Sequence, residues 1–563
     1  MAEAAAPQGD SQSLFRALRT DRTLQAMFLF ALAAGLPYAI LAGTITAWFT
    51  SYEVSVSTIG VLSWITLAYA FKFLWSPGLH RTKPLFFARL GLRRAWILGF
   101  QFIIVAALGS LAFLSPVTQL GWIALAALIG AAASASQDIV IDAWRIESAR
   151  DDKHLDAISA VYQFGYRGAG LIGGMLALFL SDIIGWPLTL GFVALTMAAA
   201  SAGALIAREP KREIADDVKP TGVSLGGNVS VNIRNIAVLA IIASWIWAFY
   251  LIGDFMVQTL VAEDPPSART FTRESGVFVV AATVLFPALV GALLLHLDRR
   301  ASRATAAPWP GQATADTLYR SILEPLMDLI QRLAWAAPLV LLLVLSYRFT
   351  DLIWGSFAYP FYMGLNFGAL GHTASEVAIA SKTIGVLMTF TGAALGGLAL
   401  AWLGRMSCLI IGAVGAAATN LLFFDLAIGA PVLGGLLEFT RLYDLFGLFG
   451  ADERLSRLIL AIAGENIAVG FASVVFVAYL SSIVNPRFAT VQYALLASLT
   501  MLIGTLGRAE IGQLVEERGF AFVFILTALM GLVAVAASVG EALRRRFAPS
   551  QAERDAAAAK VSP

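Results

Sequence analysis

Two carboxylates inside an apolar stretch are the first residues of this chain that could do chemistry. Asp138 and Asp142 are four residues apart, so on a helix they share one face. Lys72 and Arg167 lie in two other apolar stretches. Lys72 and Asp142 each lie near the predicted cytoplasmic end of their own stretch. Those two are predicted to form a structural ion pair or a gate, whereas the deeper Asp138 is predicted to bind and release a proton. A permanent ion-pair network that only orders the helices is the alternative.

A second set of side chains could bind a polar, anionic ligand. Aromatic rings stack on sugar rings, amides bond hydroxyl groups, and a cation pairs with a carboxylate. A single aromatic ring near the end of a membrane span more often belongs to an interfacial belt. Gln137 is a stronger candidate, because a buried amide must find a partner or line water. The predicted substrate-binding residues are Gln137, Arg167, Tyr166, Lys382, Trp48, Asn466 and Gln492.

The elements that must position these residues are membrane-spanning helices. The chain has 563 residues, of which 58% are hydrophobic, 13% are charged and 49 are glycine. Soluble chains are closer to a quarter charged, and small residues let membrane helices pack closely. This composition excludes a soluble enzyme, a secreted disulfide-rich protein and a disordered chain. The net charge of +2 gives no argument for a nucleic-acid partner, and the single cysteine, Cys408, is predicted to be a small core residue.

Hydropathy predicts fourteen spans, arranged as six, two and six, and Lys and Arg gather in alternate loops, which places both termini in the cytoplasm. The fold class is therefore an all-α integral membrane protein of two six-helix bundles plus two inserted transmembrane helices. The predicted parts are a cytoplasmic tail (1–23), the N-terminal bundle (24–207), a cytoplasmic linker (208–235), the inserted helix pair (236–297), a linker with an amphipathic helix (298–335), the C-terminal bundle (336–543) and a cytoplasmic tail (544–563).

Motifs for several kinds of chemistry are missing from the sequence. There is no phosphate-binding G-x-x-x-x-G-K-[ST] loop and no H-E-x-x-H zinc motif. No catalytic residue, metal site or cofactor is predicted, and the proton is the expected coupling ion. Two six-span halves around a central site are typical of a secondary transporter that works by alternating access. In the second half, Arg348 and Asp351 are three apart and are expected to pair locally.

Two strings in the sequence are quite specific, F-K-F-L-W-S-P at 71–77 and S-Q-D-I-V-x-D-x-W at 136–144. They resemble the AmpG muropeptide permeases of the major facilitator superfamily. Gly165-Tyr166-Arg167 and Glu465-Asn466 extend the resemblance, which covers nearly all of 24–541 except 208–335. Two features depart from the family pattern. His80 stands where an Asp is usual before Arg81, and the extra helix pair lies between the halves rather than after them.

The resemblance implies a major facilitator fold and a function. The chain is expected to be a monomeric, multi-pass protein of the bacterial inner membrane. It would import anhydro-muropeptides, which are N-acetylglucosaminyl-1,6-anhydro-N-acetylmuramic acid with or without peptide, by proton symport for peptidoglycan recycling. In organisms with inducible β-lactamases such import also bears on β-lactam resistance. Transport of another anionic solute, such as acetyl-coenzyme A or a siderophore, and a membrane sensor that does not transport are the alternatives.

Overall fold

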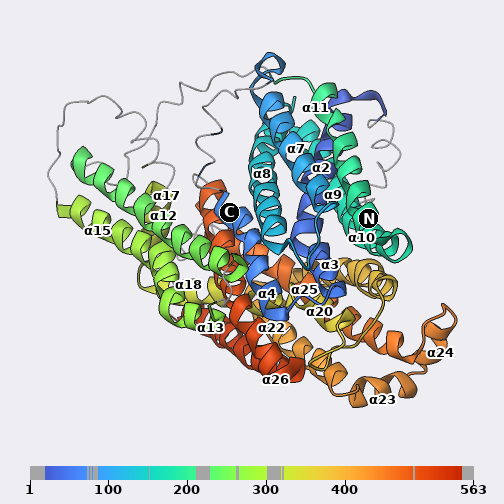
Figure 1. Cartoon of the computed structure of the whole chain (residues 1–563). Helices are drawn as coiled ribbons and strands as arrows, with labels where there is room; N and C mark the ends of the chain where they lie inside the picture. The colour runs from blue at the N-terminus through green and yellow to red at the C-terminus, as the bar shows by residue number, and fades with distance from the viewer. Residues whose placement is uncertain are drawn as a thin grey trace, which may run out of the picture. The chain divides into compact units, whose positions relative to one another are not determined.

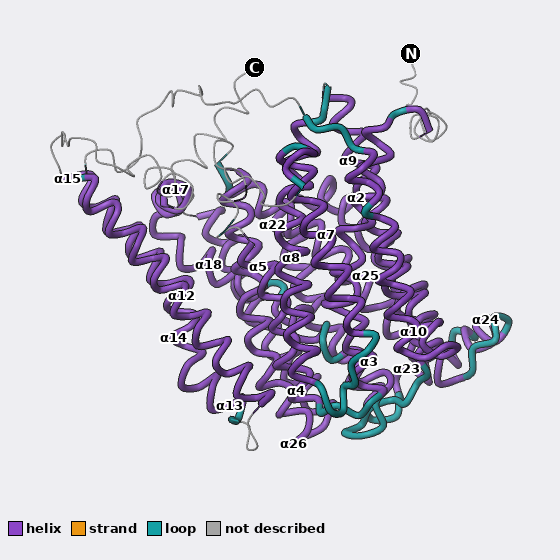
Figure 2. The backbone as a smooth tube through the Cα atoms, turned by 45° about the horizontal axis from the view of Figure 1, so that its top comes forward, coloured by secondary structure: helices purple, strands orange, loops and turns teal. Residues whose placement is uncertain are grey.

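The computed structural model of the chain is built from helices joined by loops (Figures 1 and 2). It describes residues 19–72, 75, 79, 87–150, 152–210, 229–261, 266–300, 319, 323–485 and 489–547. Most of the predicted tails at 1–23 and 544–563 and of the linkers at 208–235 and 298–335 lies outside the described residues, as do His80 and Arg81. Within the described ranges every regular element is a helix.

The chain divides into two compact units. Unit 1 comprises Met1–Ile45 and Leu74–Asp217, and unit 2 comprises Thr46–Phe73 and Val218–Pro563. The region around the second predicted span, at 46–73, thus packs within unit 2, although its neighbours in sequence on both sides belong to unit 1.

Unit 1 is a group of long apolar helices. Its first helix, α2, begins after Asp21, whose carboxylate accepts a hydrogen bond from the Thr23 backbone N–H at 2.7 Å and so caps the helix. Trp144 and Phe30 meet edge to face at 5.1 Å in the core of the unit. The helices of unit 1 are α2 (Arg22–Ala39), η1 (Ile40–Thr44), η4 (Ala88–Leu90), α7 (Leu92–Leu111), α8 (Leu120–Glu147), α9 (Asp152–Gly170), η5 (Leu171–Leu176), α10 (Ala177–Ala200) and α11 (Ala202–Ile206).

Unit 2 starts with helices from the N-terminal part of the sequence. These are α3 (Ile45–Ser51), α4 (Val56–Leu62), η2 (Ser63–Thr66) and α5 (Leu67–Phe71). The predicted inserted pair at 236–297 is seen as α12 (Val231–Val261) followed by α13 (Ala268–Phe271), η6 (Thr272–Gly276), α14 (Val277–Val280), η7 (Ala281–Leu285) and α15 (Phe286–Arg300). In Figure 1, α12 and α15 lie side by side, and they are in contact.

The rest of unit 2 holds the C-terminal helices. The predicted amphipathic helix is described over α17 (Glu324–Leu333), and its earlier part is outside the described residues. The remaining helices are η9 (Ala334–Ala336), α18 (Ala337–Ser346), α19 (Phe349–Trp354), α20 (Ala358–Met363), α21 (Ala374–Val377), η10 (Ala378–Ile384), α22 (Gly385–Ala427), α23 (Pro431–Phe439), α24 (Leu442–Gly447), α25 (Glu453–Ile483) and α26 (Ala489–Phe547).

The largest described helices reverse direction at a glycine. In α22, Gly392 and Gly396 pack on Ile467 and Phe471 of α25, and further along the chain Gly412 packs on Ala472. Later residues of α22 therefore run back along α25, and the reversal occurs at Gly404, where φ is 75° and ψ is 166°. Glycine adopts a positive φ without the steric cost that a Cβ brings.

The same geometry recurs twice. Gly165 packs on Ala31 and Gly203 on Leu29 of the same helix α2, although a straight helix between those two glycines would span roughly 57 Å. The reversal occurs at Gly185, with φ 78° and ψ 164°. In α26 it occurs at Gly519, with φ 79° and ψ 165°.

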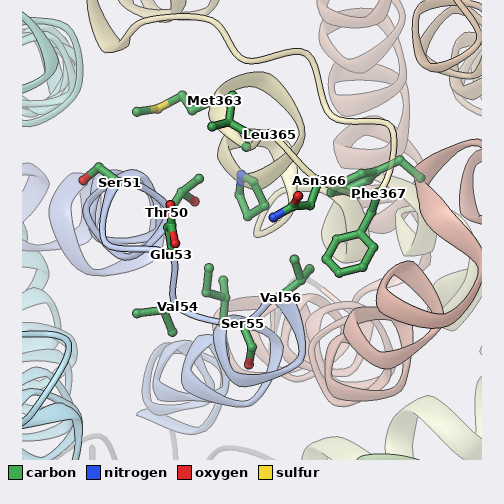
Figure 3. Close-up of a pocket in the computed structure, with 14 residues that line it drawn as sticks. Thr50, Ser51, Glu53, Val54, Ser55, Val56, Met363, Leu365, Asn366 and Phe367 are labelled. Atoms are coloured by element: carbon green, nitrogen blue, oxygen red, sulfur yellow. The ribbon is translucent and has the colours of Figure 1, made fainter.

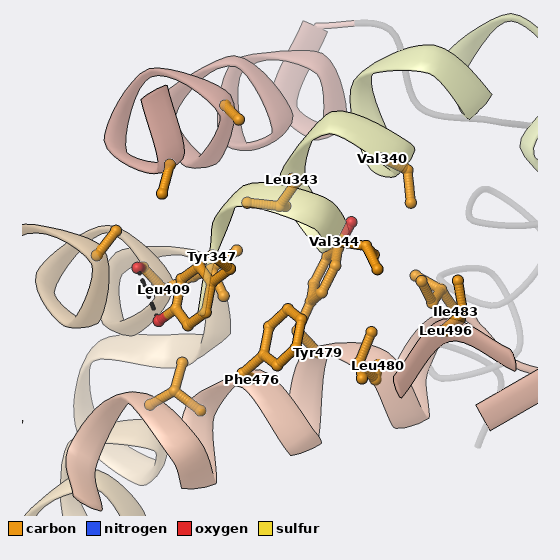
Figure 4. Close-up of a cluster of buried hydrophobic side chains, with 14 of the residues drawn as sticks. Val340, Leu343, Val344, Tyr347, Leu409, Phe476, Tyr479, Leu480, Ile483 and Leu496 are labelled. Atoms are coloured by element: carbon orange, nitrogen blue, oxygen red, sulfur yellow. Dashed lines mark hydrogen bonds between the residues drawn. The ribbon is translucent and has the colours of Figure 1, made fainter. Parts of the chain in front are cut away.

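A buried apolar cluster in unit 2 holds α18 against α22 and α25 (Figure 4). The Tyr347 ring stacks on Phe476 at 4.7 Å, and its hydroxyl donates a hydrogen bond to the Leu409 carbonyl at 3.1 Å. Cys408 is fully buried in this cluster, which confirms its prediction as a small core residue. The buried hydroxyl thus gains a partner while the ring fills the core.

The described residues contain ten helices that are long and apolar enough to cross a membrane. Three of the ten, at Phe164–Ile206, Ala374–Ala427 and Leu499–Phe547, include the glycine reversals, and Val56–Tyr69 is a shorter apolar helix. The prediction of a polytopic, all-helical membrane protein is confirmed. Hydropathy places breaks between consecutive predicted spans at 180–185, 402–405 and 514–519, and each reversal lies within or at the edge of one of them.

Candidate functional site

Helix α8 carries the two carboxylates that the sequence singles out. Asp142 forms an ion pair with Arg145, one turn further along α8, with 3.1 Å between Oδ1 and Nη2. The Arg145 guanidinium in turn lies 5.2 Å from the Tyr162 ring centroid. Asp138 and Asp142 both act electrostatically on the Tyr162 hydroxyl. The structure therefore places Asp138, Asp142 and Arg145 around one tyrosine of α9.

Gln137 holds α8 against α2 and keeps one atom unbonded. Its side chain is fully buried, and its Nε2 donates a hydrogen bond to the Ala33 carbonyl at 3.0 Å. Its Oε1 has no hydrogen-bond partner among the described residues. A buried carbonyl oxygen without a donor is costly, so this oxygen is suited to accept a hydrogen bond from a ligand hydroxyl, an amide or water.

Two of the predicted substrate-binding residues, Tyr166 and Arg167, lie on α9. The Tyr166 ring is half-buried and lies 5.9 Å from the Tyr162 ring. Arg167 is exposed in the described structure, although it lies in an apolar region. A guanidinium forms strong, often bidentate hydrogen bonds with carboxylates and phosphates, so Arg167 remains a predicted substrate-binding residue.

Lys382 and Asn466 occupy unit 2 in different ways. The Lys382 Nζ lies 5.4 Å from the Tyr359 ring centroid, within the range of a cation–π contact. Asn466 is bonded at both ends of its amide. Its Oδ1 accepts from the Thr389 hydroxyl at 2.9 Å, and its Nδ2 donates to the Ile462 carbonyl at 2.9 Å. The structure therefore uses Asn466 to join α25 to α22.

Gln492 is bonded even more completely. Its Oε1 accepts hydrogen bonds from Arg332 Nη2 at 2.9 Å and from the Asn485 backbone N–H at 2.7 Å. Its Nε2 donates to the Pro325 carbonyl at 2.8 Å and to Asp328 Oδ2 at 2.7 Å. Gln492 thus ties α17 to the segment that joins α25 to α26, and its role as a substrate ligand stays a prediction.

Two other predicted residues lie in unit 2. Trp48 is almost fully buried and stacks on Phe49 at 5.7 Å, and its Nε1 has no hydrogen-bond partner within the described ranges. Lys72 is half-buried at the end of α5. Because Lys72 belongs to unit 2 and Asp142 to unit 1, the ion pair predicted between them stays a prediction. The local pair predicted between Arg348 and Asp351 is confirmed, with 2.8 Å between Nε and Oδ2.

A cavity of about 460 Å³ in unit 2 was not anticipated from the sequence. One wall is formed by the end of α3 and the turn to α4, which include Thr50 and Glu53, and the other by the segment after α20, which includes Asn366 and Phe367. Figure 3 shows the Asn366 amide pointing into the cavity toward the Thr50–Glu53 side. The positive φ angles of Glu53 and Phe367 shape both walls, and hydropathy carries no signal for them.

A histidine, His372, lies just before α21 in the segment that follows this cavity. The His372 backbone N–H donates to the Tyr362 carbonyl at 2.7 Å, and His372 Nδ1 lies 2.9 Å from Glu376 Oε2. Glu376 and Thr373 form a capping box at the start of α21. Burial lowers the pKa of His372 below its ordinary value, although the hydrogen bond and the charge of Glu376 oppose that effect.

Comparison with known proteins gives relatives over most of the chain. A family model described as acetyl-coenzyme A transporter 1 matches residues 25–119. The chain is similar to the anhydromuropeptide permease of Escherichia coli K12, with 27% identity over 519 residues that cover 90% of this chain and 78% of that protein. It is also similar to putative transporter AmpG 4 of Rickettsia felis, with 24% identity over 92% of this chain and 95% of that protein.

Solved structures of transporters are similar to this chain in fold. A POT family peptide transporter in an auto-inhibited form matches with a TM-score of 0.59 and 14% identity, over 93% of this chain and 97% of that one. The nucleoside transporter NupG matches with a TM-score of 0.52 and 12% identity, over 92% of this chain and 99% of that one. At such low identity the likeness concerns the fold alone.

Proposed function

Since this chain belongs to the AmpG and acetyl-coenzyme A transporter family of major facilitator secondary transporters and is not an enzyme, we propose that it imports anhydro-muropeptides by proton symport. The observation that carries the proposal is the similarity to an anhydromuropeptide permease over 90% of the chain, a range that includes the Gln137–Asp138 pair. The substrate would be N-acetylglucosaminyl-1,6-anhydro-N-acetylmuramic acid with or without its peptide.

The architecture that we propose has fourteen spans. Each of the three helices that reverse at a glycine supplies two spans, and Val56–Tyr69 supplies one that is too short to be among the ten long helices. We propose the parts as two six-helix bundles (24–207 and 336–543) and an inserted pair (236–297). Both termini lie in the cytoplasm of a bacterial cell, with the monomer in the inner membrane.

In the proposed mechanism, Asp138 binds the coupling proton. Its position on α8 beside Gln137 and within electrostatic range of Tyr162 supports this role, because protonation there would change the charge next to a polar, ligand-facing group. Lys72 and Asp142 act as a gate or a structural pair. The substrate contacts are Gln137, Arg167, Tyr166, Lys382, Trp48, Asn466 and Gln492.

Transport of acetyl-coenzyme A is the second candidate. It is favoured by the family model that matches residues 25–119, which is described by that activity. The two substrates differ in chemistry, since a coenzyme A ester carries phosphates and a muropeptide carries carboxylates.

The test is uptake of radiolabelled disaccharide-anhydro sugar into proteoliposomes that contain the purified protein, with and without an imposed pH gradient. We expect accumulation that depends on the gradient and that unlabelled anhydro-muropeptide, but not acetyl-coenzyme A, competes away. Asp138→Asn should abolish accumulation and retain exchange of labelled for unlabelled substrate. Gradient-driven accumulation by Asp138→Asn at the wild-type level would exclude Asp138 as the coupling site, and competition by acetyl-coenzyme A alone would favour the second candidate.

A further inference from the structure

A second carboxylate neighbourhood lies in unit 2, apart from the residues used so far. A small cavity of about 10 Å³, which is near the size that holds one water molecule, lies between α19, α22 and α25. Its lining includes the carboxylates of Asp351 and Glu465, the Thr350 and Thr419 side chains and the Asn420 amide. The cavity therefore offers polar partners to a water molecule and brings two acidic residues to one small space.

The two carboxylates differ in their partners. Asp351 is held by Arg348 at 2.8 Å, and the Arg348 Nη1 also donates to the Ser473 hydroxyl at 2.7 Å. For Glu465, in contrast, the described part of the chain supplies neither a hydrogen bond nor an ion pair. Asp351 acts on it electrostatically.

The neighbour of Glu465 along α25 does find hydrogen-bond partners. The next residue on α25, Asn466, is bonded at both ends of its amide, so the surrounding helices are able to supply donors and acceptors at this depth. A carboxylate in a membrane helix costs free energy when it is ionised without a cation, and binding a proton removes that cost. The cavity beside Glu465 is near the size of one water molecule, and a water molecule there can donate a proton to the carboxylate or accept one from it.

We propose that Glu465 is a second proton-binding residue of the transport cycle, which exchanges its proton through the cavity that it shares with Asp351. The proposal rests on the proposed proton-coupled transport. In one state the carboxyl of Glu465 is protonated and neutral. In the other it gives the proton to water in the cavity and becomes a carboxylate, while Asp351 stays paired with Arg348 throughout.

The other charged and titratable groups around Glu465 are few. Arg348 and Asp351 come from the α18–α19 region, and Tyr362 from α20 acts electrostatically on Glu465. Lys382 of η10 lies over the Tyr359 ring. If a shift of the helices brings Lys382 to Glu465, the proton is released. Such a shift is the change that alternating access supplies.

The first experiment needs no substrate. Infrared difference spectra of the purified full-length protein between acidic and alkaline pH should show the C=O band of a protonated carboxyl that Glu465→Gln removes. Glu453→Gln is the matched control, because Glu453 lies on the same helix α25, is largely exposed and pairs with Arg457. It should leave the band unchanged. If the band is identical in the wild type and Glu465→Gln, Glu465 does not titrate and the proposal is wrong.

The second experiment links the group to transport. Glu465→Gln should reduce gradient-driven accumulation to the level seen without a gradient while substrate exchange continues and becomes independent of pH. Glu465→Asp should restore part of the accumulation. Wild-type accumulation by Glu465→Gln would overturn the proposal. If the wild type accumulates no anhydro-muropeptide at all, the substrate assignment fails, yet the infrared band still decides the protonation of Glu465.

Discussion

Two buried glutamines, one in each unit, show how differently the same side chain is used. Gln137 of unit 1 and Gln492 of unit 2 are both fully buried. Gln492 has four hydrogen bonds, which connect it to α17, to the Asn485 backbone and to a charged pair. Gln137 has one, and its carbonyl oxygen is left without a donor in the described structure. Burial alone therefore does not distinguish these two amides, whereas the number of their hydrogen-bonded atoms does.

The largest expected effect is the loss of the Gln492 junction. Gln492→Leu leaves Arg332 Nη2, the Asn485 N–H and the Pro325 carbonyl without this partner, and each buried unsatisfied group costs about 1–3 kcal/mol. We expect a loss of stability on the order of 3 kcal/mol, seen as a lower midpoint of thermal unfolding in detergent and a lower folded yield. If Gln492→Leu unfolds at the wild-type temperature, Gln492 does not stabilise the fold through these hydrogen bonds.

The next effect concerns the two candidate cations, one in each unit. If Arg167 or Lys382 binds the peptide carboxylates of the substrate, its replacement by Gln removes a charge-assisted hydrogen bond worth about 1.5–3 kcal/mol, or roughly tenfold to a hundredfold in affinity. The measurement is binding of a peptide-bearing muropeptide and of the bare disaccharide to each variant. A selective loss for the peptide-bearing form identifies the cation that reads the peptide, and equal losses for both ligands would assign the residue to packing.

A smaller effect on stability is expected at Gln137. Gln137→Leu removes one hydrogen bond and also removes the unsatisfied oxygen, so the stability should change by about 1 kcal/mol or less. The same replacement at Gln492 is the matched control. Substrate affinity should fall in Gln137→Leu although the unfolding midpoint is nearly unchanged. Wild-type affinity together with a large loss of stability would make Gln137 a structural amide like Gln492.

The smallest expected effect is a difference between the two units in how their stability depends on pH. Because burial lowers the pKa of His372, the unfolded chain binds its proton first, and the stability of unit 2 should fall as the pH drops below 6.5. The pKa of Asp21 in unit 1 is also lowered, since the Thr23 N–H and Arg150 outweigh the effect of burial. Its contribution is lost only as the pH falls below 3.8.

The measurement is the unfolding midpoint between neutral and mildly acidic pH, for the wild type and for His372→Gln. The variant should lose part of the pH dependence in this range. Asp21→Asn is the control, because it should leave the slope in this range unchanged. An identical slope in His372→Gln and in the wild type would show that His372 does not contribute.

Hydropathy and residue spacing predict a large part of the fold. The breaks between predicted spans coincide with the reversals at Gly185, Gly404 and Gly519, because glycine and polar residues interrupt apolar runs there. The local pair between Arg348 and Asp351 follows from helical spacing and is confirmed. Hydropathy and residue spacing did not predict the cavity that is lined by the segment after α20. The walls of this cavity depend on backbone angles and not on composition.

The hydrogen-bond and ion-pair partners of many polar side chains could not be predicted from the sequence either. Gln492 bonds to residues about 160 positions earlier in the chain, and no periodicity connects α17 with α26. Asp142 pairs with Arg145 on its own helix, a partner that depth along the spans did not identify. A sequence locates polar groups in apolar helices, but their partners come from how the helices pack.

The glycine reversals bear on how the chain is made. In each of the three cases two long apolar helices are separated by a single residue outside the helical range of angles. In the proposed fourteen-span architecture so little chain lies between the two helices of each pair that we expect the pair to enter the membrane as one hairpin during synthesis. A side chain at the turn, which disfavours the positive φ, would delay the closing of that hairpin and so affect the yield of inserted protein before it affects any step of transport.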